Sequence, residues 1–213
     1  MEILAYDPYH IGIKISPQFP IEQIRKKLLP KLRSSEFQVD VNDEIPTNIQ
    51  HEVEVIAKDE NNRIEFNYKL HALNTEGEDP IKTTNTFKKL LEVIGDSGFE
   101  LKGIAPTIDI VTNVFVKTDS SPNELINNSI KCDLTPWSEI NEEAKFVNGL
   151  KIDLIDEKYG KESLRIIIGS SSLNPTTQLA LTIRYLHIET QPIIDFGENL
   201  QNRVMKFINS LGD

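Results

Sequence analysis

The stretch Tyr9-His10-Ile11-Gly12-Ile13-Lys14-Ile15 decides how the N-terminal part of the chain folds. Its apolar residues alternate with polar residues or glycine, and this period of two predicts a strand that is buried on one face. Apolar residues then recur at helical spacing from Ile21 to Leu32, which predicts an amphipathic helix. Because Pro30 falls inside that pattern, we expect the helix to end or kink near Leu29.

The rest of the first half continues with strands and a second helix. Residues 53–57 and 64–72 are typical of two strands, and the turn signal at 59–62 between them indicates an antiparallel hairpin. Residues 74–80 are typical of a loop. Apolar residues at helical spacing over 87–94 predict a helix, with glycines just beyond it as C-terminal stops.

The second half has a similar order of elements. We expect a strand at 107–117, a helix at 122–130, strands at 150–155, 164–168 and 179–188, and a closing helix at 200–211. A change of phase near Thr112 suggests a bulge in the first of these strands. Ser121-Pro122-Asn123-Glu124 is a capping-box start for the first helix.

Both halves therefore consist of a strand, a helix, several strands and a helix. This order predicts an α+β protein made of duplicated β-α-β(n)-α units, with an antiparallel sheet covered by helices on one face. We place the two repeats at residues 1–98 and 99–213. No Gly- or Ser-rich linker separates them, so the two sheets can fuse into one domain.

The order of elements, taken with Gly98-Phe99 and Thr112-Asn113-Val114, resembles the TATA-binding-protein fold. In that family a Leu-Gly-Phe-like helix end leads into a strand that carries a Gln-Asn-Ile/Val-like tripeptide. Phe146-Val147-Asn148-Gly149-Leu150 is similar to the family's Phe-Pro-Gly-Leu segment at the start of a strand. The resemblance implies a duplicated, saddle-like sheet.

The same resemblance implies that Asn113 corresponds to a groove-contacting asparagine. Its counterpart in the first repeat falls near His10 or Ile11, where no asparagine stands. That family also intercalates paired phenylalanines to kink DNA. Phe66, in contrast, shares its parity with Ile64, Tyr68 and Leu70, and these residues are expected in the core. The resemblance therefore supports the architecture and not a DNA function, because a fold does not carry function with it.

The charge balance points away from nucleic acid. Thirty-three acidic and 23 basic residues give a net charge of −10, whereas DNA-binding proteins present basic patches to phosphates. The small basic cluster between Arg25 and Arg33 is expected to be the solvated face of its helix. An acidic chain suits a basic protein partner better.

Polar residues gather on the strand positions opposite the apolar ones. They are Lys14, Glu52, Glu54, Glu65, Asn67, Lys69, His71, Asp109, Lys151, Asp153, Arg165 and Arg184. Cross-strand charge pairing on a solvated face is the simplest interpretation. The functional interpretation is a ligand or partner surface near Lys69, His71, Asn113 and Arg184. Trp137, in an acidic connection, is either packed there or an exposed anchor for a protein partner.

Motifs of enzymes and cofactor sites are missing from the sequence. It has no GxSxG elbow, phosphate-binding glycine loop or HExxH, and its four histidines lack metal-ligand spacing. The single cysteine, Cys132, excludes an intramolecular disulfide. We expect no catalytic residue, metal or cofactor, although enzymatic activity stays open. No run approaches the ~20 apolar residues of a membrane span, and no basic-then-apolar leader is present, so we expect no membrane association and a cytoplasmic location.

Three functions remain open at this point. The first is a non-enzymatic binding or assembly module that contacts another protein, or a second copy of itself, through its sheet face or a sheet edge. The second is a nucleic-acid-binding saddle, which needs a contiguous positive sheet face. The third is a small-ligand-binding or enzymatic domain with a pocket between helices and sheet. Interspersed charges on the face favour the first.

Overall fold

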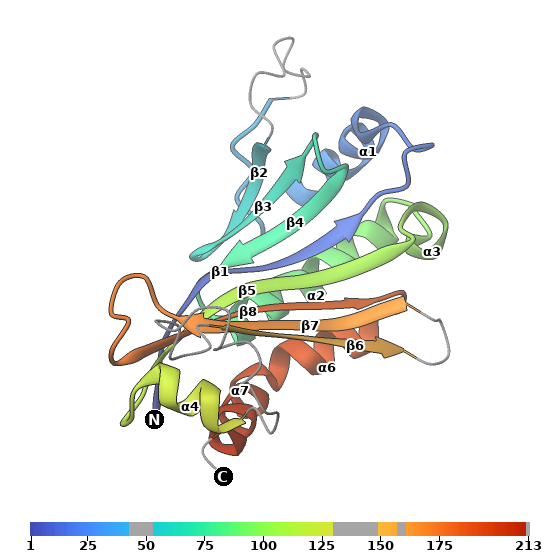
Figure 1. Cartoon of the computed structure of the whole chain (residues 1–213). Helices are drawn as coiled ribbons and strands as arrows, with labels where there is room; N and C mark the ends of the chain where they lie inside the picture. The colour runs from blue at the N-terminus through green and yellow to red at the C-terminus, as the bar shows by residue number, and fades with distance from the viewer. Residues whose placement is uncertain (43–52, 130–148, 157–160, 212–213) are drawn as a thin grey trace. The chain divides into compact units, whose positions relative to one another are not determined.

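The chain is an α+β protein whose eight strands form one antiparallel sheet, in the order β2-β3-β4-β1-β5-β8-β7-β6. A computed structural model describes residues 1–42, 53–129, 149–156 and 161–211 (Figure 1). The elements are β1 (Glu2–Lys14), α1 (Ile21–Arg33), β2 (Val53–Asp59), β3 (Asn62–Asn67), β4 (Ala72–Gly77), α2 (Pro80–Asp96), α3 (Leu101–Ile104), β5 (Thr107–Lys117), α4 (Pro122–Ser129), β6 (Gly149–Asp156), β7 (Lys161–Ser170), β8 (Gln178–His187), α6 (Thr190–Glu198) and α7 (Leu200–Ser210). Among the described residues, no helix combines the length and the hydropathy that a membrane crossing needs.

The described residues group into two compact units. The larger unit comprises Pro8–Thr112 and Arg184–Asn199. The smaller unit comprises Met1–Asp7, Asn113–Ile183 and Leu200–Asp213. The division into repeats at 1–98 and 99–213 stays a prediction.

In the larger unit, the alternation in β1 produces the predicted half-buried strand. Tyr9, Ile11 and Ile13 are almost completely buried, and the Tyr9 hydroxyl lies 3.3 Å from Oγ1 of Thr84 in α2. The odd-numbered side chains of β1 therefore face α2. This helix begins at Pro80, where the Asp79 carboxylate accepts hydrogen bonds from two backbone N–H groups of the first turn.

Buried polar side chains fix α2 against the hairpin formed by β2 and β3. Asn62 donates to Thr86 at 2.9 Å and accepts from Thr83 at 3.0 Å. Thr86 in turn donates to Asp59 at 2.8 Å. Gly77 is required beside this network, because a Cβ there would lie 2.0 Å from Oδ1 of Asn62.

The predicted loop at 74–80 is wrong, because β4 occupies residues 72–77. The preceding strand ends at Asn67, whose side-chain Oδ1 accepts the backbone N–H of Leu70 at 2.8 Å. His71 then adopts a φ of 50° and completes the reversal into β4. Leu70, expected in the core with Phe66, is consequently 58% exposed at the turn, whereas Phe66 is buried as predicted.

Two further predictions about element boundaries are corrected. The first helix does not stop near Leu29, since α1 continues through Pro30 to Arg33 and Leu32 is buried on its apolar face. The backbone N–H of Ser34 bonds to the Pro30 carbonyl and helps to close the helix. The expected phase change in β5 is absent from its burial, because even-numbered residues remain buried from Ile108 through Thr112 to Val116.

In the smaller unit, β6 and β7 form the predicted antiparallel pair, with Ile152 opposite Ile166. The helix predicted from the capping-box signal is α4, and the backbone N–H of Leu125 bonds to the carbonyl of Ser121 just before it. Oγ of Ser129, at the end of α4, donates to the Leu211 carbonyl at 3.0 Å. This bond ties α4 to the residue that follows α7.

Candidate polar site on the sheet face

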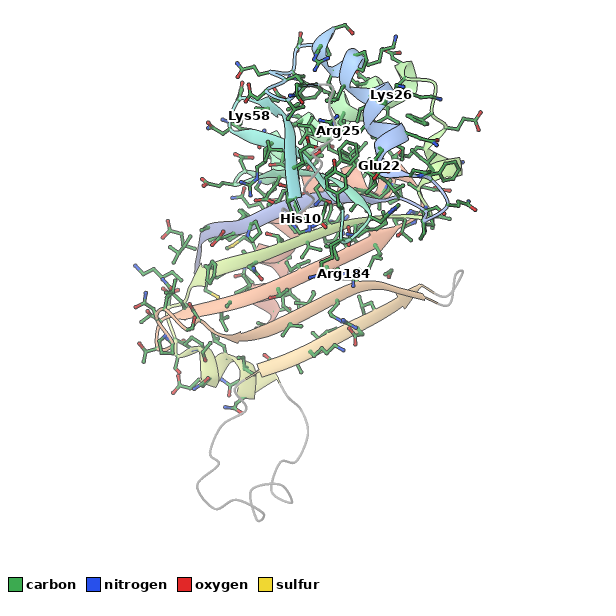
Figure 2. All side chains as sticks on the ribbon, turned by 90° about the horizontal axis from the view of Figure 1, so that it is seen from above. His10, Glu22, Arg25, Lys26, Lys58 and Arg184 are labelled. Atoms are coloured by element: carbon green, nitrogen blue, oxygen red, sulfur yellow. The ribbon has the colours of Figure 1, made fainter. Side chains whose placement is uncertain are left out.

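A group of polar side chains occupies the face of the larger unit opposite α2. We call it the sheet-face cluster, and it comprises His10, Lys14, Arg63, Glu65, Asn74, Glu76, Asp109 and Arg184. The strand registers place His10 opposite Glu76 and Glu65 opposite Asn74. Figure 2 labels His10 on β1 and Arg184 on β8. The even-numbered side chains of β1 therefore share one surface with side chains of β3, β4, β5 and β8.

The Asp109 carboxylate is the centre of this cluster. Its side chain is only 2% exposed, yet it lies on the polar face of β5. Nζ of Lys14 lies 3.4 Å from Oδ1 of Asp109, and Nη2 of Arg184 lies 3.4 Å from Oδ2. Two cations from neighbouring strands thus offset the charge of one buried acid, as burial of a carboxylate requires.

Gly12 allows two oxygen atoms to approach the backbone of β1. A Cβ at this position would lie 2.6 Å from Oδ1 of Asp109 and 3.0 Å from Oδ1 of Asn74. Both of these oxygens are buried, and neither accepts a hydrogen bond within the described chain. An unsatisfied buried acceptor costs about 1 to 3 kcal/mol. The cluster therefore holds two acceptors without hydrogen bonds near one point, although the Lys14 ammonium lies 3.4 Å from one of them, Oδ1 of Asp109.

Two glutamates, Glu65 and Glu76, also belong to the cluster. Nδ2 of Asn74 donates to Oε1 of Glu65 at 3.3 Å, and Nε of Arg63 lies 3.5 Å from Oε2 of Glu65. Arg63 also donates to Glu76. Burial raises the pKa of Glu65, as does the charge of Glu76, while Asn74 and Arg63 act in the opposite direction.

His10 completes the cluster on β1. Burial lowers its pKa from the ordinary value of 6.5, and Lys14 adds to this effect, while Asp109 and Glu76 oppose it. The imidazole is therefore neutral at neutral pH. It adds a polar group to the cluster without adding charge.

The sequence-predicted site residues fall in different surroundings. Arg184 belongs to the sheet-face cluster, whereas Lys69 and His71 lie in the turn between β3 and β4 and not on a strand. Asn113, in the smaller unit, accepts a hydrogen bond from the Thr182 hydroxyl at 2.8 Å. Trp137 lies outside the described residues. The same holds for Cys132, His51, Glu52 and the segment 146–148.

Glu54 was expected on the open face, and this prediction is wrong. A register shift between Val55 and Ala57 places Glu54 opposite the buried Phe66. There it accepts hydrogen bonds from Arg25 at 2.8 and 3.0 Å and from the Tyr68 hydroxyl at 2.6 Å. Arg25, expected on a solvated helix face, is only 1% exposed. Burial and the Glu54 carboxylate both raise the pKa of Tyr68, so its hydroxyl remains protonated.

The smaller unit carries its own charge-paired group. Nζ of Lys151 lies 2.8 Å from Asp153, and Nε of Arg165 donates to the other Asp153 oxygen at 2.7 Å. These bonds, that of Arg165 first, lower the pKa of Asp153. Asp153 stands opposite Arg165 in the register, so this is a cross-strand pair of the predicted kind.

The cluster supplies hydrogen-bond donors, hydrogen-bond acceptors and charges of both signs. Within the described ranges no group of three or more His, Cys, Asp or Glu side chains could hold a metal ion. The sequence prediction had placed Lys14, Glu65, Asp109 and Arg184 on this face. It had missed His10 and Arg63, and also Asn74 and Glu76 on β4. Their alternation with buried Leu73 and Thr75 in β4 was the available signal, but the polar composition of 74–80 resembled a loop.

No protein-family model matches the chain, and no curated protein matches it. A solved structure described as Methanococcus jannaschii TBP aligns with 99% of this chain and 97% of that chain, with 10% sequence identity and a TM-score of 0.36. This is a weak resemblance to the TATA-binding-protein-like fold, and it identifies no specific protein.

Proposed function

We propose that the chain is a non-enzymatic binding or assembly module whose partner is another protein, and that the sheet-face cluster forms part of the contact surface. The supporting observation is the pairing of charges on the sheet. A basic saddle would use Lys14, Lys69, Lys151, Arg165 and Arg184. Four of these, all except Lys69 in the turn between β3 and β4, lie within 3.4 Å of an aspartate oxygen. Their signs are interspersed within each unit.

This pairing favours a protein partner over nucleic acid. Binding to phosphates derives most of its free energy from free cations that displace condensed counterions. Cations held by Asp109 and Asp153 must first give up those partners, and the whole chain carries a net charge of −10. A partner protein can instead match both signs, because complementary charges on protein surfaces provide specificity.

The same proposal includes the internal duplication. Residues 1–98 and 99–213 are two copies of a β-α-β(n)-α unit. In support, the order β2-β3-β4-β1 in the sheet is followed by β5-β8-β7-β6, which is the order expected when equivalent strands mirror each other. β2 and β6 are then equivalent strands that form the two edges of the sheet. The unpaired backbone groups of an edge strand can pair with a strand of a second copy of the chain.

We assign the chain to the cytoplasm on its cysteine content. A single cysteine in 213 residues suits a reducing compartment better than an oxidising one.

Co-purification with two matched variants tests the proposed surface. Arg184→Glu reverses a charge in the sheet-face cluster, whereas Lys82→Glu makes the same change at an exposed position on α2. Native mass spectrometry of tagged protein from its own host should show the same second polypeptide, or a second copy, with the wild type and Lys82→Glu. Arg184→Glu should lose it. A partner retained by Arg184→Glu, or a bare 24.2 kDa wild-type monomer, contradicts the proposal.

Two further results would support the alternatives. Salt-dependent binding of the wild type to a random-sequence DNA duplex would support the nucleic-acid saddle. A bound mass of a few hundred daltons would support a small-ligand site, on the order of the size that a protein pocket encloses.

A further inference from the structure

Three side chains form a buried polar chain across the sheet of the larger unit. Glu65 on β3 receives the Asn74 amide at 3.3 Å, and Asn74 on β4 directs its Oδ1 to the space over Gly12. Asp109 on β5 directs its own Oδ1 to the same space. All three residues are more than nine-tenths buried.

This row of polar side chains lacks a hydrogen bond between Asn74 and Asp109. Oδ1 of Asn74 and Oδ1 of Asp109 are both acceptors, and neither receives a hydrogen bond from the described residues. Lys14 lies 3.4 Å from Oδ1 of Asp109 and offsets its charge without such a bond. The orientation of the Asn74 amide causes this mismatch, because its only donor group is turned toward Glu65. An amide has nearly the same shape after a turn of 180°, which exchanges its oxygen and its NH2 group.

A turned amide would give Asp109 a hydrogen-bond donor, but it would leave no donor between Asn74 and Glu65. Nδ2 of Asn74 could then donate to Oδ1 of Asp109, while Oδ1 of Asn74 would face the Glu65 carboxyl. Two acceptors would meet there unless Glu65 carried a proton, since a protonated carboxyl is a donor. One proton therefore supplies partners for both of the unsatisfied oxygens.

We propose that Glu65 and Asn74 form a two-state proton switch, in which proton uptake by Glu65 turns the Asn74 amide so that it donates to Asp109. Ionised Glu65 holds the amide in the orientation described above. Protonated Glu65 donates to the turned amide and completes a chain of hydrogen bonds from β3 to β5.

The charged groups around Glu65 are consistent with this switch. Those that act on its carboxyl are Arg63 on its own strand and Glu76 on β4. The other charged or titratable groups on this face are Lys58 on β2, His10 and Lys14 on β1, Asp109 on β5 and Arg184 on β8. Arg63 is half exposed and shares its charge with Glu76, so it stabilises ionised Glu65 weakly. Burial has the larger effect and raises the pKa of Glu65.

Proton uptake would change the surface as well as the core of the sheet. It removes one negative charge and leaves Arg63 with Glu76 alone, so the sheet-face cluster becomes more positive. This consequence for partner binding rests on the proposed function, whereas the switch itself needs only the isolated chain. Binding to the partner should then vary with pH over the range in which Glu65 titrates.

Nuclear magnetic resonance of the isolated chain tests the switch directly. The Glu65 carboxyl carbon reports its titration, which burial shifts upward from the ordinary pKa of 4.5. Nuclear Overhauser effects from the Asn74 side-chain amide report its orientation. Above the Glu65 midpoint the amide protons should contact the Glu65 side chain, and below it they should contact the Gly12 α-protons.

Two variants separate the switch from a general effect of charge. Glu65→Gln offers both a donor and an acceptor at every pH, and only the orientation in which it donates to Asn74 leaves the Asn74 amide free to donate to Asp109. Its Asn74 amide should therefore contact Gly12 at every pH. Glu76→Gln removes a neighbouring carboxylate, and it should keep the transition but move the midpoint to lower pH. The proposal is overturned if the wild-type Asn74 contacts stay constant through the Glu65 titration, or if Glu65→Gln retains the contacts of the ionised form. Should Glu65→Gln fail to fold, the wild type and Glu76→Gln still decide the question.

Failure of this test and failure of the proposed function are distinguishable. The nuclear magnetic resonance experiment contains no partner, so constant Asn74 contacts would leave the co-purification result intact. Loss of the partner proposal would likewise leave the titration of Asn74 unaffected.

Discussion

Removal of the Glu54 side chain should leave a buried positive charge without its main partner. Arg25 on α1, which Figure 2 labels beside Lys26, is 1% exposed and makes two hydrogen bonds to Glu54 at 2.8 and 3.0 Å. Tyr68 donates a third hydrogen bond to the same carboxylate. In Glu54→Ala the guanidinium retains its bond to the Asn42 carbonyl but loses the negative charge of Glu54.

The expected loss of stability follows from these contacts. Removal of one partner of a buried ion pair typically costs about 3 to 5 kcal/mol. Glu54 is 13% exposed, so water reaches part of the carboxylate and the lower end of that range applies. The lost acceptor of Tyr68 adds about 1 kcal/mol. We expect Glu54→Ala to lower the free energy of unfolding by about 3 to 4 kcal/mol.

A double variant shows whether the buried charge causes the loss. Arg25→Met with Glu54→Leu removes both charges and keeps most of the side-chain volume, so it should be less destabilising than Glu54→Ala by at least about 2 kcal/mol. Lys26→Ala, at an exposed neighbour on α1, should stay within about 0.5 kcal/mol of the wild type. Urea denaturation measures all four proteins. A cost below about 1 kcal/mol for Glu54→Ala, or an equal cost for the double variant, would refute the reasoning.

Three predictions concern the sheet-face cluster and its pH dependence. Gly12→Ala should lower the free energy of unfolding by about 1 to 3 kcal/mol, because its Cβ would displace the Asp109 and Asn74 oxygens; a gain in urea denaturation would contradict this. The lowered pKa of His10 means that the unfolded chain binds more protons below about pH 6.5. His10→Gln should therefore lose less stability than the wild type as the pH falls from about 7 to about 5, and an identical melting-temperature profile would be evidence against it. The pKa of Glu65 is raised, so its effect on stability has the opposite sign. The wild type should lose stability as the pH rises from 4.5, the ordinary pKa of a glutamate, through the higher pKa of Glu65 in the folded state. Glu65→Gln should remove this loss and be more stable than the wild type at neutral pH, and an unchanged difference across the pH range would count against burial as the cause.

The sequence was most informative where hydrophobic periodicity and burial agree. In β1 the apolar residues at odd positions are the ones that face α2, so both the strand and its polar face could be predicted. In β4 the buried side chains include Asn74 and Thr75, and polar residues in a core strand carry no periodic hydrophobic signal. The strand was therefore mistaken for a loop.

Glu54 shows why parity alone does not place a side chain. Alternation along β2 puts Glu54 on the same face as Glu52 and opposite to Val55, but the register shift between Val55 and Ala57 inserts an extra residue. The side chain then meets Arg25, which helical spacing had assigned to the solvated face. Sequence patterns do not reveal such a shift, because it is a property of the pairing between β2 and β3.

The candidate site was predictable in its charged residues and not in its geometry. Lys14, Asp109 and Arg184 share one parity along their strands, and this is visible in the sequence. The burial of Asp109 depends on Gly12 and on cations from two other strands. Those contacts depend on tertiary structure.

Covalent labelling of lysines in the co-purified complex tests the central claim most directly. Lys14 lies in the sheet-face cluster and is 24% exposed, while Lys82 lies on the exposed surface of α2. If the cluster contacts a protein partner, mass spectrometry should show that the partner lowers the labelling of Lys14 and leaves that of Lys82 unchanged. Equal labelling of Lys14 with and without the partner would contradict the claim.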